Sequence, residues 1–223
     1  MPGAEILLEP GNITRLLGGL WVTLQIGLIS IALSIPLGII VGMLMTLKNI
    51  VVKIIMRIYL DFIRIMPQLV LLYIVFFGLA TGTGLNFDGI TSSVIVFTLW
   101  GAAELGDLVR GSLESIPKSQ YESAQVLGFS RFQTFAHVVL PQAVRRLVPP
   151  SVNLATRMVK TTSLCMLIGV VEVIRVGQQI IDFYRFQYPT GALWIYGAIF
   201  ILYFLICFPL SLASRGLEKR FAK

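Results

Sequence analysis

The chain has 223 residues, of which 56% are hydrophobic and 13% are charged, and its mean hydropathy is +0.84. Soluble domains carry about 25% charged residues, so this composition excludes a soluble globular protein and indicates an integral membrane protein. The net charge of +7 would also suit binding to nucleic acid, but no basic stretch with interleaved aromatic residues supports that class.

Uncharged segments predict the membrane spans. Residues 16–47, 65–87 and 186–214 contain no charged residue or histidine, and each exceeds the ~20 apolar residues that cross a bilayer as a helix. Shorter uncharged segments at 89–103 and 161–171 predict two more spans. We therefore expect an all-α polytopic membrane helix bundle of about five transmembrane helices.

This bundle is expected to form a single domain over residues 1–223. The expected spans are 16–47, 55–81, 89–111, 150–173 and 191–214, with a long polar loop over about 113–149.

The basic residues predict the topology. With the N-terminus outside, the inner loops and span ends at 48–64, 105–160 and 215–223 hold 15 of the 18 Lys and Arg residues. This is the positive-inside bias of membrane proteins. The basic excess is therefore mainly a topology signal, with the C-terminus in the cytoplasm. Met1–Asn12 has no basic residue, so a cleavable signal peptide is not expected.

The first two spans carry packing signals. Gly38 and Gly42 form a GxxxG pair, which lets helix backbones approach closely. Arg57, Asp61 and Arg64 open the second span at spacings that place them on one helix face. Pro67 follows and is expected to kink this helix or to start a new one.

The third span carries three charged residues at intervals of three, namely Glu104, Asp107 and Arg110. Asp107 and Arg110 lie near its inner end and are expected to form a structural ion pair. Glu104 lies deeper, and intramembrane carboxylates are costly enough that they usually face a partner or a water-filled path.

The polar loop contains helix signals of its own. Ser119 is expected to cap a helix that runs to Leu127, Gly128 ends it, and Ser130 caps a second short helix. Prolines at 141, 149 and 150 mark the return to the membrane. From the residues alone this loop is either a surface for another protein or a connector.

The fourth span begins with two cations. Arg157 and Lys160 are three residues apart and share a helix face, and three hydroxyl residues follow, Thr161, Thr162 and Ser163. These hydroxyls can serve a substrate or bond to their own helix backbone. His137 is the only histidine, so we expect neither a metal site nor a histidine-based hydrolase.

The polar loop resembles the signature of permease subunits of ATP-binding-cassette (ABC) importers. That signature reads Glu-Ala-Ala, three residues, Gly, nine residues, Ile, one residue, Leu-Pro. The spacing is kept here, with serine for the first alanine and Val138 for isoleucine; the matching residues are Glu122, Ser123, Ala124, Gly128, Leu140 and Pro141.

Other segments resemble the polar amino acid branch of this family, which includes histidine, glutamine, glutamate and arginine permeases. They are GGLWVTLQI in the first span, IRIMPQLVLLY in the second, LPQAVRRLVPPSVN after the signature and KTTSLCMLIGVVEV in the fourth. The resemblance covers essentially the whole chain and implies the type I ABC importer permease fold, in the bacterial cytoplasmic (inner) membrane.

The resemblance also implies partners. In the family the signature forms a cytoplasmic coupling helix that sits in a groove of an ATPase subunit. We therefore expect two ABC ATPase subunits, a second permease that is identical or homologous, and an extracytoplasmic amino-acid-binding protein. The chain has no Walker A motif, so it is expected to be a non-catalytic subunit without a cofactor, with ATP bound by the partner. The alternative is an ATP-independent channel or secondary transporter for small polar solutes.

An amino acid substrate presents an ammonium and a carboxylate, so its site needs groups of both signs. One hypothesis assigns Arg157 to the carboxylate and Glu104 to the ammonium. Family resemblance adds Asp107 and Lys160 to the expected substrate path, and Thr161, Thr162 and Ser163 lie nearby. The alternative is that Arg157 and Glu104 pair with each other, or that Arg157 extends toward the inner face. The two cations favour an acidic or neutral substrate, whereas Glu104 would suit a cationic one.

Overall fold

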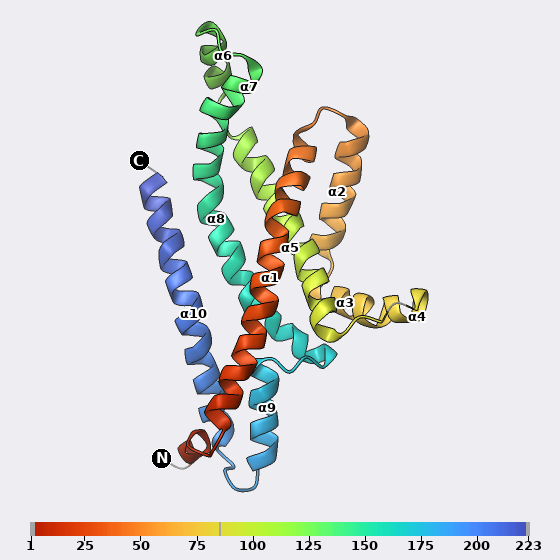
Figure 1. Ribbon diagram of the computed structural model, residues 1–223, viewed down its shortest axis with the longest axis vertical. Coiled ribbons are helices and arrows are strands. Elements are labelled where there is room, and N and C mark those ends of the chain that lie inside the picture. The colour runs from red at the N-terminus through yellow and green to blue at the C-terminus, as the bar shows by residue number, and fades with distance from the viewer. Residues whose placement is uncertain (1–2, 85, 222–223) are drawn as a thin grey trace. The chain divides into compact units, whose positions relative to one another are not determined.

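The computed structural model describes residues 3–84 and 86–221 (Figure 1). Helices make up 86% of the chain, and the described ranges contain no β-strand. The expected all-α fold is therefore confirmed. Residues 1–2, 85 and 222–223 of the expected domain lie outside the described residues.

Ten α-helices follow one another along the described residues. They are α1 (Asn12–Thr46), α2 (Ile50–Ile65), α3 (Gln68–Tyr73), α4 (Leu79–Thr83), α5 (Gly89–Glu114), α6 (Lys118–Val126), α7 (Arg131–Thr134), α8 (Leu140–Thr161), α9 (Val173–Tyr184) and α10 (Gly191–Phe221). Short 3₁₀ segments lie at Ala4–Leu7 and Thr162–Ile168, and π-helical turns lie at Ile74–Gly78 and Phe135–Val139.

Three of these helices, α1, α5 and α10, are each long and apolar enough to cross a membrane. Two bent pairs bring the total to five: Ile50–Ile65 with Gln68–Gly78, at 102°, and Arg131–Ile168 with Val173–Tyr184, at 50°. The expected number of spans agrees with this total.

The helices add detail to two expected spans. The second, 55–81, contains the break expected at Pro67, because α2 ends before this proline and α3 starts after it. The helix of the fourth, 150–173, starts before the expected span, because α8 is already helical from Leu140 and continues through Pro149 and Pro150. Hydropathy detects only the apolar part of a helix, so it missed the polar first turns of α8.

The chain forms two compact units, each assembled from segments far apart in sequence. Unit 1 contains Met1–Ser30, Pro67–Phe97 and Thr156–Pro209, and unit 2 contains Ile31–Met66, Thr98–Ala155 and Leu210–Lys223. The helices α1, α5, α8 and α10 contribute residues to both.

Unit 1 has an aliphatic core between the start of α1 and the helices α9 and α10. Its buried members are Ile6, Leu16, Val173, Val176, Ile180, Ile195 and Ile199. Glu172 lies fully buried at the N-cap of α9 and accepts hydrogen bonds from the backbone N–H groups of Ile174 and Arg175, at 3.0 and 2.9 Å. These bonds and the helix dipole stabilise a carboxylate there.

In unit 2 the second half of α1 packs closely on α5. A Cβ atom on Gly42 would lie 2.5 Å from the Cβ of Val109 and 2.7 Å from the backbone oxygen of Gly106. One on Gly38 would lie 2.7 Å from the Cβ of Leu105. The close packing expected from the GxxxG pair is therefore confirmed. The Tyr59 hydroxyl also donates to the backbone oxygen of Leu99 at 2.7 Å, which ties α2 to α5.

Candidate functional site

The segment with the signature spacing folds as two short helices, α6 and α7, joined by a tight turn (Figure 1). The predicted Ser119 cap was wrong, because the N-cap of α6 is Pro117, two residues earlier, and Lys118 is the first helical residue. The prediction for Ser130 is confirmed. Its hydroxyl accepts from the N–H of Gln133 at 3.2 Å, and the Gln133 side chain accepts from the Ser130 N–H at 2.8 Å.

Gly128 makes the turn between these helices. Its φ angle is +80°, a left-handed conformation that costs an L-residue with a side chain about 1–2 kcal/mol. The N–H of Gly128 donates to the oxygen of Gln125 at 2.9 Å, and that of Phe129 donates to the oxygen of Ala124 at 3.0 Å. Both bonds satisfy carbonyl groups at the end of α6, so the glycine sets the direction in which the chain leaves this helix.

The two faces of α6 differ in exposure. Ala124 is only 2% exposed, whereas Glu122 and Ser123 are exposed and line a shallow surface depression. The side chains of Val126 and Leu127 are 87% and 75% exposed. A projecting pair of apolar residues beside a carboxylate is typical of a protein-docking surface. Leu140 and Pro141 open α8 and complete the signature.

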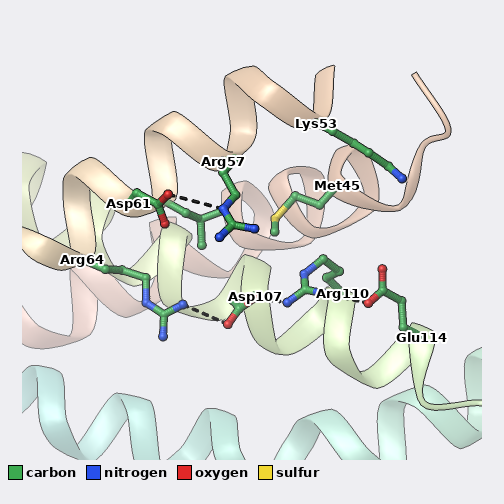
Figure 2. Close-up of a pocket in the computed structure, with 9 residues that line it drawn as sticks. Met45, Lys53, Arg57, Asp61, Arg64, Asp107, Arg110 and Glu114 are labelled. Atoms are coloured by element: carbon green, nitrogen blue, oxygen red, sulfur yellow. Dashed lines mark hydrogen bonds and ion pairs between the residues drawn. The ribbon is translucent and has the colours of Figure 1, made fainter. Parts of the chain in front are cut away.

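A second feature of unit 2 is a charged cavity between α2 and α5 (Figure 2). Its volume is about 420 Å³. It is lined by Met45, Lys53, Arg57, Leu60, Asp61, Arg64, Asp107, Arg110 and Glu114.

Ion pairs of alternating sign run along one side of this cavity. Arg64 contacts Glu104 at 2.8 Å and Asp107 at 2.9 Å, and Arg110 contacts Asp107 at 2.6 Å and Glu114 at 2.7 Å. The predicted pair of Asp107 with Arg110 is confirmed. Glu104 faces a charged partner, Arg64. The sequence does not reveal this partner, because the contact joins two helices whose register only the tertiary structure shows.

A looser pair also lines the cavity, on its α2 side. Arg57 and Asp61, predicted to share a helix face, lie 3.4 Å apart on α2, with side chains 81% and 56% exposed. Figure 2 shows this pair one turn from the contact of Arg64 with Asp107.

Asp107 is the branch point of the network, and its removal is expected to destabilise the protein. The Asp107→Asn variant keeps the shape of the side chain but leaves two arginines without their shared carboxylate, which we expect to cost about 1–3 kcal/mol. Asp61→Asn is the matched control, because its exposed pair contributes about 0–1 kcal/mol. Thermal unfolding in detergent micelles measures both, and equal midpoints for the two variants would contradict the assignment.

The predicted residues of the fourth span lie at the end of α8 and in the 3₁₀ segment after it. Arg157 and Lys160 share an exposed face, as expected. The Thr161 hydroxyl donates to the backbone oxygen of Arg157 at 2.9 Å, and the buried Thr162 hydroxyl donates to that of Val159 at 2.7 Å. Both threonines therefore bond to their own helix, while Ser163 is half-buried.

The structure does not bring together all the predicted substrate residues in one unit. Glu104 and Asp107 belong to unit 2, whereas Arg157, Lys160 and the three hydroxyl residues belong to unit 1. Within unit 2, Glu104 pairs with Arg64.

Comparison with known proteins identifies the family. Residues 34–223 match the family described as the binding-protein-dependent transport system inner membrane component. The chain belongs to this family. It is therefore a transport component that spans the membrane several times, and the alternative of an ATP-independent channel or secondary transporter is not favoured.

Individual relatives match over nearly their whole length. The chain is 34% identical to the probable glutamine ABC transporter permease protein GlnP of Bacillus subtilis, with 91% of each chain covered. It is 32% identical to the glutamine transport system permease protein GlnP of Escherichia coli, with 93% of each covered.

Solved structures share the fold. A crystal structure of an amino acid ABC transporter with histidines matches with a TM-score of 0.83 at 23% identity, over 93% of this chain and 94% of that one. An inward-facing structure of the methionine ABC transporter MetNI matches with a TM-score of 0.76 at 18% identity, over 96% of this chain and 100% of that one.

Proposed function

We propose that this chain is the permease subunit of an ATP-driven bacterial amino acid importer. The observation that carries the proposal is the match over almost the full length to glutamine permeases, together with the signature loop folded as two helices about Gly128. L-Glutamine is the first substrate to test, because both relatives are named for it.

The proposal includes partner chains. Two ATPase subunits would each receive the α6–α7 element of one permease, and their closure on ATP would push on the membrane helices through it. The exposed Val126 and Leu127 support this docking, because apolar side chains at such a projecting tip are costly to leave in water. A second permease completes the translocation path, and an extracytoplasmic binding protein delivers the amino acid. The chain itself binds no cofactor, and ATP stays on the partner.

The proposed orientation places the N-terminus outside and the C-terminus in the cytoplasm. The support is the positive-inside bias, with 15 of the 18 basic residues on the inner side. In this orientation α6, α7 and the charged cavity lie toward the cytoplasm.

Reconstitution tests this function. The permease is reconstituted in proteoliposomes together with the ATPase and the binding protein that its neighbouring genes encode. Uptake of labelled L-glutamine, L-glutamate, L-arginine and L-histidine is then measured. We expect uptake of at least one of them that requires both ATP and the binding protein. Uptake that continues without ATP would contradict the proposal and favour a channel or secondary transporter.

Arg157 is proposed to bind the substrate carboxylate, within a path that also includes Glu104, Asp107, Lys160 and the hydroxyl residues 161–163. This assignment is supported by the exposure of the Arg157 side chain on α8, beside Lys160. Glu104 would bind the ammonium only by sharing its carboxylate with Arg64, which lies 2.8 Å away.

We expect Arg157→Ala to raise the apparent Kd for the transported amino acid about tenfold or more, since a hydrogen bond to a charged group contributes about 1.5–3 kcal/mol. Glu104→Gln is expected to weaken binding as well. Substrate-stimulated ATPase activity as a function of amino acid concentration measures both. Unchanged apparent affinity in both variants would exclude this substrate site.

A further inference from the structure

The helix α2 has two chemically different faces. Lys53, Arg57, Asp61 and Arg64 recur at helical spacing on one face and line the cavity. Exposed isoleucines at 50, 54, 58 and 65 lie beside this charged stripe. On the other side of the cavity α5 contributes Asp107, Arg110 and Glu114.

The ion pairs in this cavity differ in strength. Arg64 and Arg110 each contact two carboxylates at 2.6 to 2.9 Å. Arg57 and Asp61, both on α2, are 3.4 Å apart and largely exposed. An exposed pair of this kind contributes little to stability, so a ligand can separate it at small cost. The pairs of Arg64 and Arg110 therefore form a fixed wall, and Arg57 and Asp61 offer exchangeable charges.

Lys53 adds a further positive charge beside Arg57. It lies one turn before Arg57, and it makes no ion pair with any residue in the described part of the chain. The cavity is lined by four cations, Lys53, Arg57, Arg64 and Arg110, and by three carboxylates, Asp61, Asp107 and Glu114. Glu104, which pairs with Arg64 at 2.8 Å, balances the fourth cation, so the cluster is neutral overall and suits a ligand that carries both charges.

We propose that this cavity is an amino acid binding site at the cytoplasmic end of the transport route, separate from the site at Arg157. The α-carboxylate of the ligand pairs with Arg57, assisted by Lys53, and the α-ammonium pairs with Asp61. The site recognises the ammonium and carboxylate that all amino acids share. The proposal rests on the proposed function for the ligand class and for the orientation of the chain.

Protection of a single cysteine tests this site in the assembled transporter. Met45 lines the cavity and Met43 does not, although it is exposed two residues earlier on the same helix. The natural cysteines, Cys165 and Cys207, are both buried, which keeps background labelling low. Met45→Cys and Met43→Cys are compared in inside-out membrane vesicles with a membrane-impermeant methanethiosulfonate.

We expect the reagent to label Met45→Cys from the cytoplasmic face. Any labelling of Met43→Cys is expected to proceed at a rate that amino acids do not change, because Met43 does not line the cavity. L-Glutamine or L-glutamate at ten times its Kd is expected to slow the labelling of Met45→Cys about tenfold. Adding Asp61→Asn to Met45→Cys should abolish protection by L-glutamine while labelling persists.

Three outcomes would overturn the site. In the first, Met45→Cys is labelled equally fast with and without every amino acid. In the second, acetate protects as well as L-glutamate, which would indicate a simple anion site. In the third, anionic phospholipid alone protects, which would indicate a lipid headgroup site. Because labelling does not depend on transport, these results are distinguishable from failure of the proposed function, which appears as absent ATP-dependent uptake in the wild-type transporter.

Discussion

Gly128→Val is expected to uncouple the transporter, so that amino acid uptake falls about tenfold while the ATPase subunits continue to hydrolyse ATP. The variant must either strain the turn after α6 or change it, because valine at φ +80° carries a penalty of about 1–2 kcal/mol or more. A factor of ten corresponds to 1.4 kcal/mol. The ratio of uptake to ATP hydrolysis in proteoliposomes measures the effect.

The cause of this loss is conformational rather than steric. A Cβ atom on Gly128 would meet no other atom within 4 Å, so the added side chain has room. Asparagine tolerates the left-handed conformation better than other residues. Gly128→Asn is therefore the control, and we expect it to retain most of the coupled uptake. Equal losses for asparagine and valine would show that the glycine acts in some other way than through its backbone angle.

Gly42→Ala is expected to destabilise the protein strongly, and here the cause is steric rather than conformational. Here the backbone is ordinary helix, but the new methyl group would lie 2.5 Å from the Cβ of Val109 and 2.7 Å from a backbone oxygen of α5. Neither atom is the flexible end of a side chain, so α1 and α5 must move apart. We expect a loss of about 1–3 kcal/mol in the free energy of unfolding.

Gly111→Ala is the matched control for this variant. Gly111 lies in α5, where a Cβ atom meets nothing within 4 Å. Alanine in an open helical position is favoured over glycine by about 0.5–1 kcal/mol, so this variant is expected to be slightly more stable than the natural protein. Thermal unfolding in detergent should move in opposite directions for the two substitutions. A shift of the same sign in both would argue against close packing at Gly42.

The sequence predicted well those features that depend on neighbours along the chain. The Ser130 cap, the kink at Pro67 and the pair of Asp107 with Arg110 all involve residues within four positions of one another, and the structure contains each of them. Ser119 is an exception. It has the right side chain for a cap, but Pro117 precedes it and is already suited to the first turn of a helix.

The charged cavity required the tertiary structure. The sequence placed Arg57, Asp61 and Arg64 on one face of the second span and Glu104 and Asp107 on one stripe of the third. It did not show that these faces meet, because contact between two helices depends on their rotation and relative shift. The contacts of Arg64 with Glu104 and Asp107 supply that register.

The sequence by itself determined that this is a helical membrane protein, which way its charges favour insertion, and where the family signature lies. Each of these follows from composition or from spacing along one chain, since a bilayer selects for long uncharged segments whatever their partners. Only the tertiary structure decided where the helices bend and which partner each intramembrane charge takes. It also decided which face of α2 lines the cavity, because those features depend on packing between segments far apart in sequence.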